Sequence, residues 1–149
     1  MATLTQEQIE QRAQQAKEYF KQGYNCAQAV AVACCDLCGM DDKETAARIS
    51  AGFGGGIGRM RLTCGAASGM FMLAGLQAEG PQPLDVEGKQ RTYARVRRLA
   101  DAYKAEFGSI TCAELLGLKP AEDGTPCRHI PCAEMVAQAV RIFLTTRAE

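Results

Sequence analysis

The sequence predicts an all-α fold, a single compact bundle of five or six helices spanning residues 1–149. Apolar residues recur at intervals of three and four along most of the chain, as on the buried face of a helix. Alanine, the best helix former, occurs 24 times, and no run of β-branched residues alternates as a strand would. At 149 residues the chain has the length of one domain with its own core.

Three helices are expected in the first third of the chain. The first begins with a capping box over residues 5–8, in which threonine and glutamine side chains each accept a backbone N–H. Glycines end the first two helices, and the third runs into a glycine-rich segment. These helices begin at Thr5, at about Asn25 and with Asp41 as N-cap, and they end at Gly23, Gly39 and the run 52–58.

Three further helices and one short helical segment are expected in the rest of the chain. One starts near Thr63 and is rich in glycine and alanine, which lets another backbone come close. After a break at Gly80–Pro83, a long helix over about 85–107 has its apolar register at residues 93, 96, 100, 103 and 107. A short helix is expected at 112–116 and a final one at about 132–146.

The composition of the chain argues against some classes of function. Lysine plus arginine equal aspartate plus glutamate at 17 each, so no basic field for nucleic acid is expected. The N-terminus lacks the charged and apolar regions of a signal peptide, and no stretch is long and apolar enough for a membrane span. We therefore expect a cytoplasmic protein, in which eight cysteines are more typical of ligands or redox groups than of disulfides.

Four cysteines stand at expected helix starts. Each follows a residue that favours a helix start: a capping asparagine or threonine in three cases, and a proline in the fourth. The helix dipole and unpaired amides at such a position favour the thiolate, so we expect lowered pKa values there. The alternative is that these cysteines are small buried residues between helices. The four pairs are Asn25-Cys26, Thr63-Cys64, Thr111-Cys112 and Pro131-Cys132.

The remaining cysteines are expected to behave differently. Cys34, Cys35 and Cys38 crowd the end of the second helix, where the dipole disfavours a thiolate, so they are expected to be ordinary thiols. Cys127 could be a spare thiol, a resolving thiol or the fourth member of the set in place of Cys132. His129, the only histidine, could replace one cysteine in a metal site or could simply be a solvated loop residue.

The glycine-rich run lacks the lysine of a phosphate-binding loop, and no strand precedes it. Its amides could form an anion-binding nest, with nearby arginines offsetting the charge of a thiolate cluster. The alternative is a plain connection between closely packed helices. The candidate cofactor-binding residues are Gly54, Gly55, Gly56, Arg59 and Arg61.

Residues spread over most of the chain resemble the C_GCAxxG_C_C family, small proteins named for a four-cysteine pattern and regarded as redox-active. The resemblance runs from about residue 18 to 146 and is carried by Asn25-Cys26-Ala27, the run 52–58 leading to the CGAASG sequence at 64–69, Cys112 and Cys132. The order around Cys64 departs from the GCAxxG of the family name. The family is also similar to the cluster-bearing part of split-Soret-type cytochromes, which implies an iron–sulfur centre, whereas haem-attachment motifs are absent here.

We therefore expect a redox protein, an oxidoreductase or electron carrier, in which Cys26, Cys64, Cys112 and Cys132 are the metal ligands or the redox-active thiols. An iron–sulfur cluster for electron transfer or redox sensing is the first hypothesis. A metal-free thiol–disulfide protein and a structural all-thiolate zinc module are the alternatives.

The expected partners are a redox protein and further copies of the chain, with neither nucleic acid nor a membrane span. The stripe Arg91, Arg95 and Arg98 on the long helix is either a docking site for an acidic redox partner or a solvated face.

Overall fold

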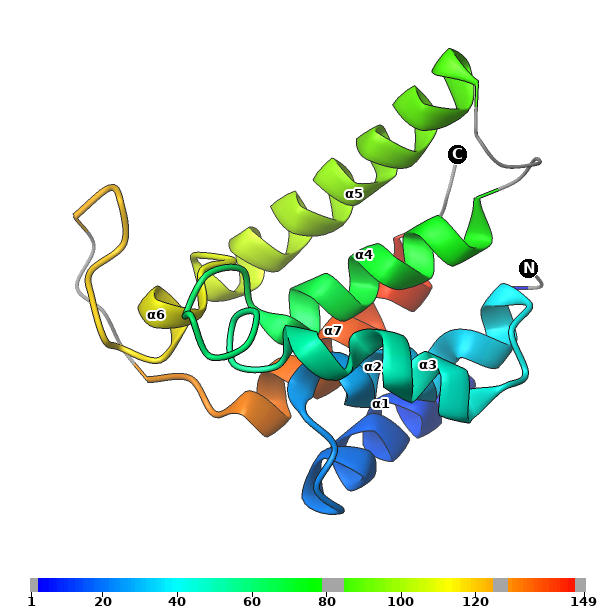
Figure 1. The fold of residues 1–149 in the computed structure, drawn as a ribbon, viewed down its shortest axis with the longest axis horizontal. Coiled ribbons are helices and arrows are strands. Elements are labelled where there is room, and N and C mark those ends of the chain that lie inside the picture. The colour runs from blue at the N-terminus through cyan, green and yellow to red at the C-terminus, as the bar shows by residue number, and fades with distance from the viewer. Residues whose placement is uncertain (1–2, 79–84, 125–128, 147–149) are drawn as a thin grey trace.

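Helices make up most of the computed structural model, which describes residues 3–78, 85–124 and 129–146. The expected all-α fold is confirmed, and the described residues contain no β-strand, only isolated bridges. The α-helices number seven in these ranges: α1 (Gln6–Lys21), α2 (Cys26–Cys34), α3 (Lys43–Ser50), α4 (Gly65–Gln77), α5 (Val86–Phe107), α6 (Cys112–Leu115) and α7 (Cys132–Thr145), with 3-10 helices η1 (Cys35–Cys38) and η2 (Ala51–Phe53). Figure 1 shows the long helix α5 lying along α4, with α1, α2 and α3 below this pair and α6 to the left, near the lower end of α5.

Local capping sets the starts of the first three helices. The capping box at Thr5 is confirmed, and Asn25 forms a second one with Gln28 at the start of α2. The expected N-cap of α3, Asp41, is wrong by one residue. Asp42 is the cap because its carboxylate accepts both the amide of Thr45, at 3.1 Å, and its hydroxyl, at 2.6 Å.

The second helix changes character before its expected end. It is α-helical only to Cys34 and continues to Cys38 as η1, and Gly39 stops it at φ +90°. At the change, the guanidinium of Arg12 on α1 donates to the carbonyl of Ala33 at 3.0 Å. Arg12 also makes a bidentate pair with Asp36 at 2.6 and 3.0 Å.

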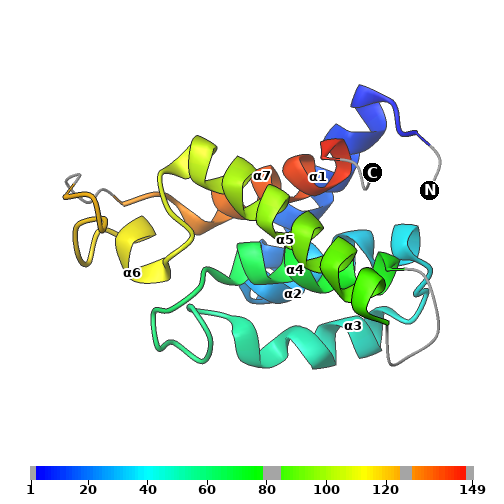
Figure 2. The same cartoon turned by 90° about the horizontal axis from the view of Figure 1, so that it is seen from above.

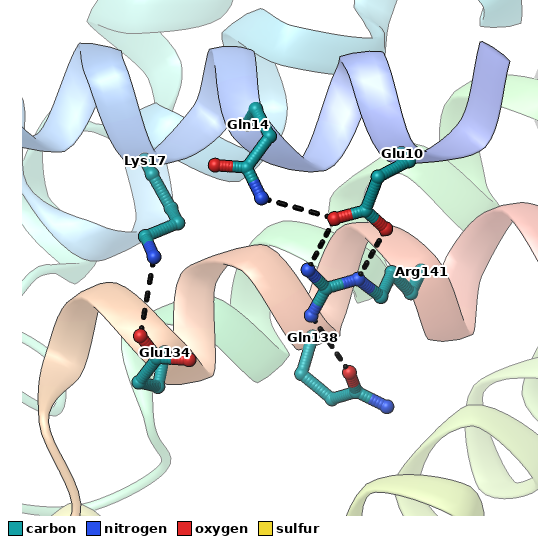
Figure 3. Close-up of polar contacts among 6 residues, drawn as sticks. All are labelled: Glu10, Gln14, Lys17, Glu134, Gln138 and Arg141. Carbon is teal, nitrogen blue, oxygen red and sulfur yellow. Dashed lines mark hydrogen bonds and ion pairs between the residues drawn. The ribbon is translucent and has the colours of Figure 1, made fainter. Parts of the chain in front are cut away.

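Helices α1 and α7 lie side by side although they come from opposite ends of the chain (Figure 3). Arg141 donates to both carboxylate oxygens of Glu10, at 2.7 and 2.9 Å, and Lys17 pairs with Glu134 at 3.1 Å. These contacts hold the Glu10 pKa at about 2, chiefly through the hydrogen bond from Arg141. Behind them the apolar faces of both helices enter the core, which α2 fills with small residues.

The register of α5 agrees with the expected one in part. Tyr103 is buried, and Val96 and Phe107 pack against the core. Tyr93, however, is 58% exposed, and the buried face also includes Arg95 and Leu99. Arg95 donates to the carbonyl of Thr146 at 2.8 Å and to Gln77 at 2.9 Å, which satisfies its charge inside the fold. The expected stripe of surface arginines is therefore wrong at Arg95, because this central member is not on the surface.

Candidate functional site

The starts of α4 and α6 are fastened to each other by a short antiparallel bridge. Thr63 pairs with Thr111, and each following cysteine donates its amide across the pair. The amide of Cys64 reaches the carbonyl of Ile110 at 2.7 Å, and that of Cys112 reaches the carbonyl of Leu62 at 2.6 Å. Two of the four predicted site cysteines are thus placed next to each other.

Cys26 joins this pair through α4. A Cβ at Gly65 would contact Cys26 Sγ and would lie 2.9 Å from the carbonyl oxygen of Phe53. Only a residue without a side chain lets α2 begin so close to α4, which is the physical reason for glycine directly after Cys64. Asn25 strengthens the junction, because its side-chain amide donates to the carbonyl of Ala51 at 2.9 Å.

Cys132 reaches the same region through the segment that precedes α7. The amide of Ile130 donates to the carbonyl of Leu115 at 2.9 Å, and His129 forms a bridge with Leu116. The Cys132 pKa is raised, mainly by burial and next by the thiols of Cys26 and Cys112. The structure therefore gathers the starts of α2, α4, α6 and α7 at one place. We call Cys26, Cys64, Cys112 and Cys132 the helix-start cysteines.

Tyr103 of α5 lies among these thiols, and the sequence did not reveal it as a site residue. Its side chain is fully buried, and its hydroxyl lies 3.2 Å from Cys64 Sγ in a hydrogen bond. Burial raises the Tyr103 pKa, and the thiols of Cys64, Cys26 and Cys132 raise it further. Tyr103 fits the apolar register of its helix, so no sequence signal separated it from ordinary core residues.

Burial outweighs the helix dipole in the titration of the site. The Cys64 pKa is raised to about 11 by burial, although the first-turn amides of Ala66 and Ala67 act to lower it. The Cys132 pKa is also raised. The expectation of lowered pKa values is therefore wrong for these two cysteines, because loss of water disfavours the thiolate more than the helix end favours it.

The caps at these helix starts also differ from the expected ones. Cys64 itself is the N-cap of α4, and the side chain of Thr111 makes no capping hydrogen bond at α6. Ser109 holds the start of α6 instead, accepting the amide of Thr111 at 2.8 Å and donating to the buried Glu114 at 3.1 Å.

The glycine-rich loop has an unusual left-handed backbone. Besides several glycines, Ile57, Arg59 and Arg61 have φ between +61° and +66°. Such values cost non-glycine residues about 1–3 kcal/mol each and concentrate at functional sites. The amides of residues 57–62 all donate to carbonyls within 52–57. These six amides are thus used inside the loop, and an anion-binding role for Gly54, Gly55 and Gly56 stays a prediction.

The loop places Arg61 beside the helix-start cysteines. Arg61 Nη1 donates to Cys112 Sγ at 3.7 Å, and the same guanidinium opposes the rise of the Cys132 pKa. Gly56, at φ +74°, backs Cys112: a Cβ there would lie 2.6 Å from Cys112 Cβ. Arg59 is exposed and packs against Gly55. Of the two candidate arginines, Arg61 is the one with a contact to a helix-start cysteine.

The other cysteines lie elsewhere. Cys34, Cys35 and Cys38, which we call the α2-end cysteines, have raised pKa values caused by burial, and that of Cys38 reaches about 12. The thiolate is disfavoured at these positions, as expected, but chiefly by burial and not by the helix dipole. His129 is exposed, with Nδ1 3.3 Å from the carbonyl of Leu116. Cys127 lies outside the described residues.

All seven cysteines in the described ranges are free. Across the same ranges, no group of three or more histidine, cysteine, aspartate or glutamate side chains meets the geometry of a metal site. None of the described helices combines the length and apolar character that crossing a membrane requires.

Comparison with known proteins adds one finding. A family model described as "Putative redox-active protein (C_GCAxxG_C_C)" matches residues 24–146, a range that includes all four helix-start cysteines. No curated protein and no solved structure matches the chain. Because the family model covers most of its length, the chain belongs to the C_GCAxxG_C_C family.

Proposed function

We propose that the chain is a redox protein whose helix-start cysteines hold an iron–sulfur cluster for electron transfer or redox sensing. The observation that carries the proposal is that the starts of α2, α4, α6 and α7, each with its cysteine, meet near the buried Tyr103, whose hydroxyl lies 3.2 Å from Cys64 Sγ. The redox-active description of the family supports the proposal.

The types of residue at the four helix starts match the ligands of such a group, although no three or more potential ligands among the described residues are arranged as a metal site. Four thiols are the donor set that iron–sulfur clusters use. Arg61 offers N–H groups and positive charge next to Cys112 Sγ, and the first turn of α4 presents amides near Cys64. When bound, the cluster supplies a one-electron carrier whose potential depends on hydrogen bonds to its sulfurs and on solvent exposure.

The chain's own residues have separate roles in this proposal. Tyr103 fixes the orientation of Cys64 and excludes water from it, because the tyrosine side chain is fully buried. Arg61 balances negative charge on the sulfurs. Gly56 and Gly65 let the backbone come close enough for the helix starts to meet. The fold then keeps Cys64 and Cys112 almost out of solvent, at 4% and 7% exposure.

This burial counts against the first alternative, a metal-free thiol–disulfide protein, at Cys64 and Cys112, whereas Cys26 and Cys132 are only partly buried. Disulfide exchange requires a thiolate to reach a sulfur of an incoming disulfide in line, so it depends on access. Cys64 and Cys112 offer little access. A structural zinc module remains the second alternative, since zinc takes the same four thiolates.

One preparation separates the three functions. The chain is purified without oxygen and assayed for iron, acid-labile sulfide and zinc, and its visible spectrum is recorded. We expect a brown protein with iron and sulfide in equal amounts. A colourless protein containing zinc would overturn the proposal in favour of the structural site. Metal-free protein that gains one disulfide on mild oxidation would overturn it in favour of thiol–disulfide exchange.

The identity of the fourth cysteine is tested in the same assay. We propose Cys132, so Cys132→Ala should lose the iron and sulfide whereas Cys127→Ala should keep them. The reverse result would assign the fourth position to Cys127. We propose the cytoplasm as the location, where thiols stay reduced and available to iron.

A further inference from the structure

We infer that the surface formed by Arg48, Ile49, Phe53, Arg59, Met60 and Leu62 docks an acidic electron-transfer protein beside the helix-start cysteines. We call these residues the loop surface. The inference rests on the proposed redox function, since it names the partner of that site. It replaces the arginine stripe of α5, whose central member Arg95 is buried.

The loop surface exposes an unusual amount of apolar side chain. Ile49 is 54% exposed, Met60 61% and Leu62 51%, and Phe53 is exposed as well. Of the eight large hydrophobic residues that are exposed in the described ranges, these four come from one short stretch of chain. Single exposed hydrophobic residues are ordinary, but four between residues 49 and 62, from the end of α3 through the loop, indicate an interaction site.

Basic residues predominate around these side chains, while Glu44, four positions before Arg48 on α3, lines the same pocket as Arg48. Between residues 45 and 78 the chain carries three arginines, Arg48, Arg59 and Arg61, and no aspartate or glutamate, although its overall charge is zero. The long helix α5 differs, because Glu87, Asp101 and Glu106 are interspersed among its basic residues. The loop surface therefore complements a partner with acidic groups around an apolar centre.

The loop surface is also part of the site wall. The carbonyls of Arg61 and Leu62 accept the amides of Ala113 and Cys112 at 3.3 and 2.6 Å, which fastens the loop to α6. Both views of the fold place residues 51–64 and α6 together at one end of the molecule (Figures 1 and 2). A protein bound there would lie next to the cysteines, as short electron-transfer paths require.

The loop is held in its shape before any partner arrives. Hydrogen bonds from the amide of Gly58 to the carbonyl of Gly52, at 2.9 Å, and from Leu62 to Gly56, at 3.0 Å, close it on itself. A surface that is already ordered loses less conformational entropy on binding. A folded protein with a surface of matching shape can bind such an ordered surface closely, whereas a fluid anionic membrane has no fixed shape to match it. The order of the loop therefore favours a protein as the partner.

The test uses a paired set of double variants. Arg48→Glu with Met60→Glu reverses a charge and removes an apolar side chain on the loop surface. Arg91→Glu with Tyr93→Glu makes the same two changes on exposed positions of α5, where Tyr93 is 58% exposed. Each protein, purified without oxygen, is titrated with a flavodoxin, a small acidic electron carrier, and with a basic c-type cytochrome. Binding is followed by calorimetry at low and at physiological salt.

We expect the loop-surface variant to weaken flavodoxin binding about tenfold at low salt, with a smaller difference at higher salt, because screening reduces surface electrostatics. The α5 variant should bind like the unchanged protein, and the cytochrome should not bind. Equal effects of the two variants, or no flavodoxin binding, would overturn the inference. Two other results would overturn it as well. One is binding to vesicles of anionic phospholipid that is lost only in the loop-surface variant, and the other is a dimer, seen by light scattering, that is lost only in that variant.

Reduction by dithionite keeps the two proposals distinct. This small reductant does not require a docking protein, so failure to react with it contradicts the proposed redox function. Loss of flavodoxin binding that spares the dithionite reaction supports the docking surface alone. Flavodoxin binding in a protein that dithionite cannot reduce would refute the redox function and leave the surface with a different role, contrary to the inference.

Discussion

The helix-start and α2-end cysteines differ in their neighbours more than in their exposure. Cys34 and Cys64 are both almost fully buried, and burial raises the pKa of both. Cys64, however, shares a hydrogen bond with Tyr103 and lies close to other helix starts. Cys34 lies inside a helix whose end is held by the ion pair between Arg12 and Asp36. The comparison teaches that position on a helix selects candidate cysteines, whereas tertiary neighbours decide what they can do.

The largest effect is expected from substituting a glycine whose backbone packs against a helix-start cysteine. Gly56→Ala should cost the fold about 3 kcal/mol, because alanine is strained at φ +74° and its Cβ would collide with Cys112. Gly52→Ala is the control, since nothing lies within 4 Å of a Cβ there. Chemical denaturation measures both. Similar stabilities for the two variants would show that the loop backbone does not pack tightly against Cys112.

Helix α4 provides a second pair, in which the two changes have opposite signs. Gly65→Ala should destabilise by about 2 kcal/mol, because its Cβ would press on Cys26 Sγ. Gly75→Ala, in open space on the same helix, should stabilise by about 0.5–1 kcal/mol through helix propensity. Thermal unfolding gives both shifts. A stabilising effect at Gly65 would contradict the close contact between α2 and α4.

Tyr103→Phe should have a smaller effect, about 1 kcal/mol, because it removes one buried hydrogen bond and leaves the packing unchanged. In iron-loaded protein we expect the midpoint potential to shift to lower values, since a donor to a ligand sulfur has been lost. Tyr93→Phe, at an exposed position of α5, is the control. Equal potentials in the two variants would show that Tyr103 is only a core residue.

The smallest effect is expected from breaking the ion pair between Arg12 and Asp36, next to the α2-end cysteines. The hydrogen bonds from Arg12 hold the pKa of Asp36 below its usual value, so this carboxylate stabilises the fold above about pH 3.8 and loses that effect as the pH falls further. Asp36→Asn should cost under about 1 kcal/mol at neutral pH, and the difference should vanish in acid. Urea denaturation over a pH series measures this. A change in bound iron would contradict the separation of the two sets.

Local sequence patterns predicted part of this architecture. Capping boxes link residues three apart, so Thr5 and Asn25 could be recognised as caps from the sequence alone. Thr63 was misjudged because it pairs with Thr111, 48 positions along the chain, and so Cys64 takes the N-cap place. Contacts between distant segments leave no trace in short windows of sequence.

The site itself was only half predictable. The four cysteines could be selected, but Tyr103 has the same helical spacing as any core residue, and its hydroxyl acquires meaning only next to Cys64. Ile57 adopts a backbone conformation that its β-branched side chain opposes, so propensity predicts against it. Arg95 is buried because carbonyl and amide oxygens from other segments surround it.

The most direct test of the central claim compares Cys64→Ala with Cys34→Ala. Both positions are almost fully buried, so both substitutions remove a similar side chain from the interior. The measurement is iron and acid-labile sulfide per chain in protein purified without oxygen, with thermal unfolding to confirm that both variants fold. We predict that Cys34→Ala retains the iron and sulfide of the unchanged protein and that Cys64→Ala retains none. Equal amounts in the two variants would contradict the account.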